Sequence, residues 1–315
     1  MIVSTTNEIL PRHVERIAQE AGSAPLVFSS MGDIPADVAA QTEALITFGD
    51  DLAAENLERF PRLQWIQIIR AGLDNLPYRY VHERGIRVTN ASGIHVKPMS
   101  EYVVLCMLHF EKDMERYRAL KEQKKYDRTK LVGELAGREA LIYGTGVIGK
   151  AVAEKLKLFD VRVRGVNTSG RPVEPFDTTY ALGEEDDVYE QADYVITILP
   201  STTQTRGFFS AERLDRMKPE AVFISIGRGD AVDENHVVQM LKDGRLRGAA
   251  FDVFQQEPLP EDSPLWECEN LLLTPHMSAK SIYYIDRCVD IFLHNWKALR
   301  HQTEMINVVD TTKEY

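Results

Sequence analysis

The sequence predicts an α/β protein built from two doubly wound, parallel-sheet domains, and three observations carry this prediction. Short apolar runs bounded by turn residues alternate with helical patterns along most of the chain, which is typical of βαβ units on a parallel sheet. A glycine-rich turn at Gly144–Gly149 joins an apolar run to a helical pattern and opens a second series of such units. The length of 315 residues suits two domains of about 150 residues each.

Each element follows from its own stretch of sequence. In the first series we expect a helix at Arg12–Ala21 and strands at Ile2–Thr5, Leu26–Ser29, Ala44–Phe48, Trp65–Ile69 and Ile86–Asn90. A long helix is expected to start at Pro98, a residue that suits the first helical turn, and to run to about Tyr126. The second series is expected to hold six strands, at Arg138–Tyr143, Arg162–Val166, Tyr194–Ile198, Ala221–Ser225, Gly248–Asp252 and Leu271–Leu273.

Six strands interleaved with helices match a complete dinucleotide-binding domain of the Rossmann type. A final helix, expected at Ile282–Arg300, lies beyond the sixth strand and is expected to return to the first domain. We therefore predict a discontinuous, smaller, flavodoxin-like substrate domain from residues 1–97 and 282–315. The Rossmann domain, residues 98–281, is inserted into it.

Composition excludes several classes of function. The net charge of -11 argues against binding to nucleic acid, because phosphates would be repelled. The first ten residues, MIVSTTNEIL, lack the pattern of a signal peptide, and the longest apolar stretch falls short of the about 20 residues that span a bilayer. Three widely spaced cysteines show neither a metal nor a disulfide pattern. We expect a cytoplasmic protein without a metal site or a membrane partner.

The glycine turn has the spacing of a dinucleotide fingerprint. Gly144 makes the tight strand-to-helix turn, Gly146 lets the backbone approach a diphosphate, and Gly149 lets the helix pack on the strand. The diphosphate is expected on free N–H groups at the start of the helix, where Val147 and Ile148 stand. Further contacts with the cofactor are expected from two residues after the strand at Tyr194–Ile198, namely Pro200 and Thr205.

The strand after this turn ends beside Asn167, where an NAD-binding enzyme usually has Asp or Glu. A carboxylate there would bind the ribose hydroxyls and repel a 2′-phosphate. The sequence instead supplies hydroxyl groups from Thr168 and Ser169 and a cation from Arg171, which suits a phosphate. We predict NADP(H) as the preferred cofactor and leave NAD(H) open, since Arg171 could be a solvated loop residue.

Polar residues follow three later strands at the edge where ligands bind in such sheets. They are Arg228 after the fourth strand, Asp252 and Glu257 after the fifth, and His276 after the sixth. Hydride transfer to a carbonyl carbon leaves negative charge on oxygen, and histidine is the side chain best suited to give the proton. A buried Glu257 would favour the charged imidazole, and the fork of Arg228 matches a carboxylate or a 2-keto acid edge.

The motifs IGRGDAVDE, FDVFQQEPLP, LTPHMS and RAGLDNLP, together with the glycine turn, resemble the D-isomer-specific 2-hydroxyacid dehydrogenases. The similarity covers nearly all the chain and is closest to the branch of glyoxylate/hydroxypyruvate reductases. It implies that Arg228, Glu257 and His276 form the catalytic triad, and that Asp252 binds the nicotinamide carboxamide. It also implies that backbone N–H groups of Ala71 and Gly72 hold the substrate carboxylate.

The sequence therefore favours an NADP(H)-preferring reductase of small 2-keto acids that gives D-2-hydroxy acids. The alternative is a nucleotide-sensing binding protein of the same fold with little turnover. Formate oxidation is disfavoured, because relatives with that activity pair the histidine with glutamine. A homodimer is expected, with the long helix and the segment Asp127–Leu135 exchanged between two copies, because the helix carries more apolar surface than one domain needs, at Tyr102, Val103, Leu105, Cys106 and Leu108.

Overall fold

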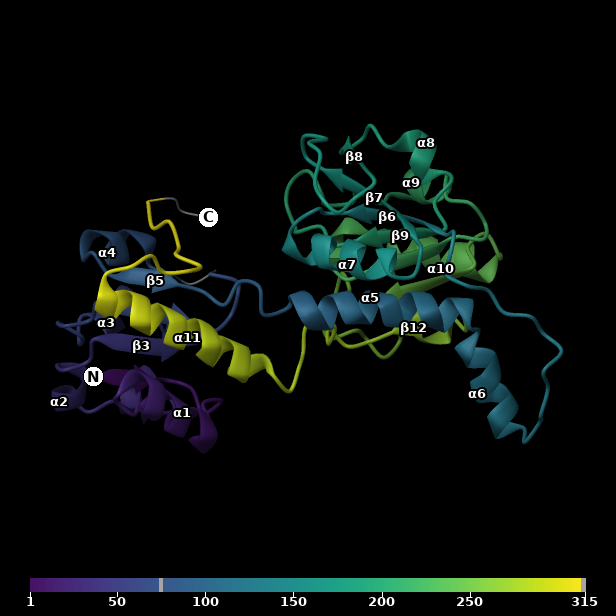
Figure 1. Cartoon of the computed structure of the whole chain (residues 1–315). Helices are drawn as coiled ribbons and strands as arrows, with labels where there is room; N and C mark the ends of the chain where they lie inside the picture. The colour runs from purple at the N-terminus through teal and green to yellow at the C-terminus, as the bar shows by residue number, and fades with distance from the viewer. Residues whose placement is uncertain (74–75, 313–315) are drawn as a thin grey trace. The chain divides into compact units, whose positions relative to one another are not determined.

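The alternating apolar runs fold into two parallel sheets, each in its own α/β unit, so the predicted fold class is confirmed. The structure is a computed structural model that describes residues 1–73 and 76–312. One unit consists of Met1–Ile94 and Ser281–Tyr315, and the other of His95–Lys280 (Figure 1). The chain therefore passes between the units twice, at Ile94–His95 and at Lys280–Ser281.

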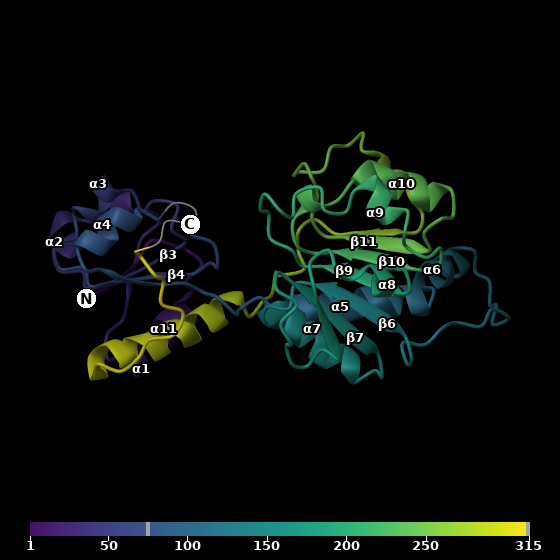
Figure 2. The same cartoon turned by 90° about the horizontal axis from the view of Figure 1, so that it is seen from above.

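The first unit has a five-stranded parallel sheet in the order β2-β1-β3-β4-β5. The strands are β1 (Ile2–Ser4), β2 (Leu26–Val27), β3 (Ala44–Thr47), β4 (Trp65–Ile68) and β5 (Arg87–Thr89). Figure 2 shows helices on both faces of this sheet, with α1 (Pro11–Ala21) and α11 (Tyr284–His301) on one side and α2 (Ala36–Ala39), α3 (Ala54–Leu57) and α4 (Tyr78–Glu83) on the other. The apolar face of α11 packs on the sheet, and its Phe292 stacks on Trp65 with ring centroids 4.9 Å apart. The last segment of the chain returns to the same sheet, where Val309 N–H donates to the Val88 carbonyl.

The second unit has a seven-stranded parallel sheet in the order β12-β11-β10-β9-β6-β7-β8. Its strands are β6 (Glu139–Tyr143), β7 (Arg162–Asn167), β8 (Thr178–Ala181), β9 (Tyr194–Thr197), β10 (Val222–Ser225), β11 (Gly248–Phe251) and β12 (Leu271–Leu273). Its helices are α5 (Val96–Glu111), α6 (Met114–Glu122), α7 (Val147–Lys157), α8 (Asp186–Tyr189), α9 (Ala211–Leu214) and α10 (Glu234–Lys242). The strand β8 was not predicted, because this edge strand has no apolar run and is at least partly exposed along its length.

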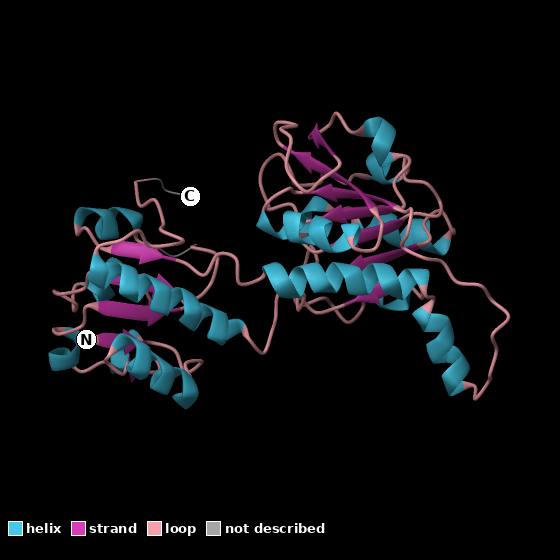
Figure 3. Cartoon of the chain, viewed as in Figure 1, coloured by secondary structure: helices cyan, strands magenta, loops and turns pink. Residues whose placement is uncertain are grey.

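The prediction of a single helix from Pro98 to about Tyr126 is wrong. The chain forms two helices, α5 and α6, which are separated at Lys112–Asp113. Asp113 takes a left-handed conformation with φ 50°, which aspartate tolerates better than most residues. Residues 123–137 then form a loop without helix or strand (Figure 3). The apolar face of α5 is also used differently from the expectation: Tyr102, Val103 and Cys106 are buried in the core of their own unit, and only Leu105 is largely exposed among the five residues named above.

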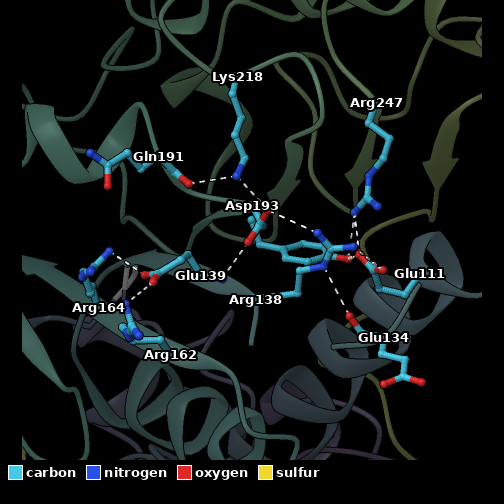
Figure 4. A network of polar contacts seen from close by, with 11 residues as sticks. Glu111, Glu134, Arg138, Glu139, Arg162, Arg164, Gln191, Asp193, Lys218 and Arg247 are labelled. Carbon is cyan, nitrogen blue, oxygen red and sulfur yellow. Dashed lines mark hydrogen bonds and ion pairs between the residues drawn. The ribbon is translucent and has the colours of Figure 1, made fainter. Parts of the chain in front are cut away.

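The amino-terminal edge of the larger sheet carries a dense charged cluster, drawn in Figure 4. Glu111, at the end of α5, is inaccessible to solvent and accepts hydrogen bonds from Arg138 at 3.1 Å and Arg247 at 2.9 Å. Asp193, before β9, accepts from Lys218 at 2.7 Å and lies 3.5 Å from Arg138. The cluster fixes the starts of neighbouring strands at the edge opposite to the predicted ligand site.

Within the described residues, the structure offers no group of three or more His, Cys, Asp or Glu side chains arranged to hold a metal ion. Over the same residues, none of the helices combines the length and apolar character needed to cross a bilayer.

Candidate active site

All the residues predicted for catalysis and most of those predicted for cofactor binding follow strands of the larger sheet. Because the strands run parallel, their carboxyl ends lie at one edge. The glycine turn follows β6, Arg228 follows β10, Asp252 and Glu257 follow β11, and His276 follows β12. The strands β10, β11 and β12 are direct neighbours, so the three turns that carry the predicted triad are adjacent.

The glycine turn has the geometry that its spacing predicts. Gly144 has φ +108°, a conformation that side chains disfavour, and a Cβ on Gly149 would stand 1.9 Å from the Gly144 carbonyl oxygen. A Cβ on Gly146 would meet none of the described residues within 4 Å, so the backbone here faces open space at the start of α7. The N-cap residue of this helix, Gly146, has no side chain to cap it, and Val147 is exposed. This open helix start fits the diphosphate of a dinucleotide.

Asn167 closes the loop after β7 instead of pointing freely outward. Its side-chain Nδ2 donates to the Arg171 carbonyl at 3.0 Å, and its Oδ1 accepts from the Ser169 N–H at 3.1 Å. Thr179 also donates to the Arg171 carbonyl, at 2.9 Å. The loop therefore has a defined shape that leaves Thr168, Ser169 and Arg171 exposed. These residues form a small cationic, hydroxyl-bearing rim.

The turn after β9 is closed by a side chain in the same way. Thr205 is buried, and its hydroxyl donates to the Pro200 carbonyl at 2.5 Å and accepts from the Thr202 N–H at 2.9 Å. Pro200 is exposed at the start of this turn. Thr205 thus shapes the turn, and Pro200 is the residue of the two that a ligand could touch.

Arg228 is exposed on a loop that two glycines press against its neighbours. A Cβ on Gly229 would fall 2.0 Å from the carbonyl carbon of Phe254, and one on Gly227 would fall 2.5 Å from the Leu199 carbonyl oxygen. The loop of Arg228 is therefore in contact with the segment that leads to Glu257. The glycines on either side of the arginine were the sequence signal for this contact, which we did not predict.

Glu257 and His276 form a hydrogen-bonded pair. Oε2 of Glu257 lies 2.8 Å from Nδ1 of His276, while Oε1 accepts from the Phe254 N–H at 3.0 Å. The carboxylate is thereby oriented at both oxygens. The expectation of a buried glutamate is wrong, since the side chains of Glu257 and His276 are 36% and 49% exposed.

Asp252 is fully buried, and its carboxylate is already bound. Oδ1 accepts from the Thr274 hydroxyl at 2.6 Å and from the Met277 N–H at 2.8 Å, and Oδ2 accepts from the Ser278 N–H at 2.9 Å. The Asp252 carbonyl accepts from the His276 N–H at 2.8 Å. In this structure Asp252 holds the histidine loop, a role that the sequence did not suggest.

Ala71 and Gly72, the residues predicted to bind a substrate carboxylate, lie in the other unit. Both are exposed in the loop after β4, where the Ala71 carbonyl accepts from the Asn90 side chain at 2.9 Å. Asp74 and Asn75 of the same motif lie outside the described residues.

Comparison with known proteins identifies the family. Residues 104–278 match the sequence model described as D-isomer specific 2-hydroxyacid dehydrogenase, NAD binding domain. The chain belongs to the D-isomer specific 2-hydroxyacid dehydrogenase family. It is 31% identical over 270 residues to a glyoxylate reductase of Korarchaeum cryptofilum, covering 83% of this chain and 80% of that protein. It is 30% identical over 245 residues to glyoxylate/hydroxypyruvate reductase B of Yersinia pestis, covering 76% and 75%.

The fold agrees with a solved member of the family. A D-isomer specific 2-hydroxyacid dehydrogenase family protein from Aeromonas salmonicida superposes with a TM-score of 0.80 at 33% identity, over 98% of both chains. The protein is therefore an oxidoreductase that uses a nicotinamide dinucleotide, near the glyoxylate reductase branch of its family.

Proposed function

We propose that this dehydrogenase reduces small 2-keto acids of the glyoxylate and hydroxypyruvate type to D-2-hydroxy acids, with NADPH as the preferred reductant. The observation that carries the proposal is the Glu257–His276 pair, which lies at the same sheet edge as the open glycine turn. The names of the two reductases compared above support this substrate class.

The residues of this chain divide the work on a keto acid. A bound nicotinamide supplies the hydride. Because Glu257 engages Nδ1 of His276, Nε2 is the ring nitrogen left to give a proton to the substrate oxygen. The carboxylate of Glu257 fixes the orientation of the ring through this hydrogen bond. Arg228, exposed after the strand next to that of Glu257, offers N–H donors to the carboxylate or keto oxygen of the substrate.

The preference for NADPH rests on the loop after β7. No carboxylate stands at Asn167 to repel a 2′-phosphate, and the exposed Ser169 and Arg171 supply a hydroxyl and a cation. Asn167 contributes by holding this loop closed through the Arg171 carbonyl. We also propose that Ala71 and Gly72 contact the substrate carboxylate directly. Asp252 is proposed to contact the nicotinamide carboxamide.

The test is a panel of 2-keto acids, including glyoxylate, hydroxypyruvate and pyruvate, assayed with NADPH and with NADH. Steady turnover with glyoxylate or hydroxypyruvate and a higher kcat/KM for NADPH would support the proposal. Tight NADPH binding without turnover of any keto acid would overturn it in favour of a nucleotide-sensing binding protein.

We also propose a homodimer formed through α6 and the segment 123–135. Its support differs from the expected apolar surplus on α5, which the core of the same unit largely covers. Tyr126 and Leu131, on the loop that follows α6, are 93% and 92% exposed. We call α6 and the segment 123–135 together the arm. A groove of about 1120 Å³ lies beside the arm and is lined by residues of α5, α6, α10 and the segment before β12. A second copy that exchanges the arm would cover both apolar side chains and groove.

A further inference from the structure

A buried chain of hydrogen bonds connects α5 to the loop of His276. The Tyr102 hydroxyl lies 2.6 Å from Thr274 Oγ1, and Thr274 Oγ1 lies 2.6 Å from Asp252 Oδ1. Tyr102 and Asp252 are both buried, and all these residues belong to the unit His95–Lys280. The three side chains therefore form one path, from a helix that carries none of the proposed catalytic residues to the segment that carries His276.

The donors and acceptors along this path have a fixed order. The Asp252 carboxylate accepts from two backbone N–H groups and from Thr274. A hydroxyl group has one hydrogen, and Thr274 gives its hydrogen to Asp252. Tyr102 must therefore donate to Thr274. Burial is the largest cause that raises the pKa of Tyr102, so its hydroxyl keeps this hydrogen over the pH range in which an enzyme is assayed.

The path ends on a backbone that needs support. His276 has φ 49°, in the left-handed region that residues with a Cβ rarely adopt. Asp252 binds the chain on both sides of it, through Thr274 before the histidine and through the Met277 and Ser278 N–H groups after it. These bonds set the direction in which the imidazole leaves the backbone, and hence where it meets Glu257.

Tyr102 and Thr274 also lie on the two segments through which the chain enters and leaves this unit. Tyr102 is on α5, which begins directly after the first crossing at Ile94–His95. Thr274 precedes the second crossing at Lys280–Ser281. Their hydrogen bond ties the two segments together inside the unit, close in sequence to each crossing.

We propose that Tyr102 is a positioning residue for His276, acting through Thr274 and Asp252 without touching substrate or cofactor. The proposal rests on the proposed function for its kinetic consequences, but the position of the imidazole can be measured without turnover. Tyr102→Phe removes only the hydroxyl and keeps the ring in the core.

Two readouts test Tyr102→Phe. In steady-state reduction, kcat is expected to fall roughly two- to tenfold, the effect of weakening one buried hydrogen bond, with the KM of the keto acid and the affinity for NADPH nearly unchanged. In nuclear magnetic resonance spectra, the ring signals of His276, assigned by comparison with His276→Gln, are expected to shift, because the ring meets the Glu257 carboxylate in a changed position.

Matched variants separate positioning from stability. Tyr194→Phe also removes one buried hydroxyl from the same unit, but at the opposite sheet edge, where it bonds Glu111. It should lower stability without moving the His276 ring signals. Thr274→Val should reproduce the effect of Tyr102→Phe, whereas Thr274→Ser, which keeps the hydroxyl, should behave like the wild type. The double variant Tyr102→Phe/Thr274→Val should lower kcat by less than the product of the two single reductions.

The proposal is overturned if Tyr102→Phe leaves both the kinetics and the His276 ring signals unchanged, or if Tyr194→Phe changes them equally. If Tyr102→Phe does not fold, the pair Thr274→Val and Thr274→Ser decides by the same measurements. A wild type without turnover would defeat the proposed function alone, since the ring signals of His276 would still test the role of Tyr102.

Discussion

Glu257 Oε2 stands 2.8 Å from His276 Nδ1, and the same carboxylate is held by the Phe254 N–H through its other oxygen. The pair is thus fixed on one side of the imidazole, which leaves the opposite nitrogen, Nε2, for the substrate in the proposed reaction. Both side chains are partly open to solvent. The chemistry proposed for this edge depends on hydrogen-bond geometry more than on burial.

Replacement of His276 by Asn should lower turnover of the best keto acid by roughly 10²–10⁴-fold, the range for loss of a general acid. NADPH binding, measured by fluorescence titration, should stay close to wild type, because the role proposed for His276 is toward the substrate and not the cofactor. A variant that keeps wild-type turnover would show that the proton comes from another group.

Glu257→Gln tests the pair itself. The amide keeps the size of the side chain but replaces the charged acceptor of the His276 ring with a neutral one. The kcat of keto acid reduction should then fall roughly tenfold, because a neutral acceptor holds the ring less firmly than a carboxylate does. Unchanged steady-state kinetics in the variant would reduce Glu257 to a loop residue that binds the Phe254 N–H.

Leu131→Glu tests the homodimer. Light scattering should report about twice the chain mass of 35.8 kDa for the wild type and a shift toward that mass for the variant, because a charge replaces an apolar contact. Leu158→Glu is the control: this leucine is also strongly exposed, at the end of α7 and away from the arm, and its variant should remain dimeric. A wild type of 35.8 kDa at working concentration would contradict the dimer.

The charged cluster of Figure 4 predicts a loss of stability in acid. Burial raises the pKa of Asp193, but hydrogen bonds from Lys218 and the Glu139 N–H, with the nearby positive charges, outweigh it and hold the pKa below its ordinary value of 3.8. A carboxyl group whose pKa is lowered by folding stabilises the fold above its unfolded pKa, and this contribution is lost as pH falls through the folded value.

The midpoint of urea unfolding of the wild type should therefore drop as pH falls below about 4. Asp193→Asn should be less stable at pH 7 by about 1–3 kcal/mol, since a buried charged hydrogen-bond partner is lost, and its midpoint should change less between pH 5 and pH 3. Asp186→Asn is the control, because its ion pair with Arg216 is half exposed and worth little. Equal pH dependence in the wild type and in Asp193→Asn would remove Asp193 from the acid response.

The sequence identified the fold class and the turns of the candidate site because those features depend on local pattern. The Gly144–Gly149 turn and the strand ends before Arg228 and His276 are each readable within a short window. Contacts between distant residues were not readable. The Tyr102–Thr274 bond joins residues 172 positions apart, and both are ordinary core or loop residues in the sequence.

Two predictions of secondary structure failed, at the break between α5 and α6 and at β8. The apolar repeat of α5 continues toward α6, so the break at Asp113 depends on a single residue in a left-handed conformation. The strand β8 was not predicted, because an edge strand does not need an apolar run. In the loop after β7, the pattern of residue types suggested a phosphate site, but it could not show that Asn167 is also the residue that closes the loop.

This double use of Asn167 shapes the test of cofactor preference. Asn167→Asp should place a carboxylate near the 2′-phosphate, a repulsion of about 1–4 kcal/mol at a separation of about 4 Å. That corresponds to roughly one to three decades in relative kcat/KM, and preference should move from NADPH toward NADH. The substitution also removes the hydrogen bond to the Arg171 carbonyl. Thr179→Val is the control, because it removes another hydrogen bond to the same carbonyl without adding a charge. It should lower kcat/KM for NADPH and for NADH by the same factor.

Arg171→Ala removes a positive charge from the same loop, whereas Asn167→Asp adds a negative one. The guanidinium pairs with a phosphate but finds no charge on the ribose hydroxyl of NADH, so the loss should fall on NADPH alone. Arg171 is exposed, and its backbone carbonyl, not its side chain, accepts the bonds that close the loop, so alanine should leave the loop shape intact. Measured kcat/KM values for both cofactors decide the matter. A wild type that prefers NADH by tenfold or more, or an Arg171→Ala variant that loses NADH and NADPH equally, would show that this loop is not a phosphate site.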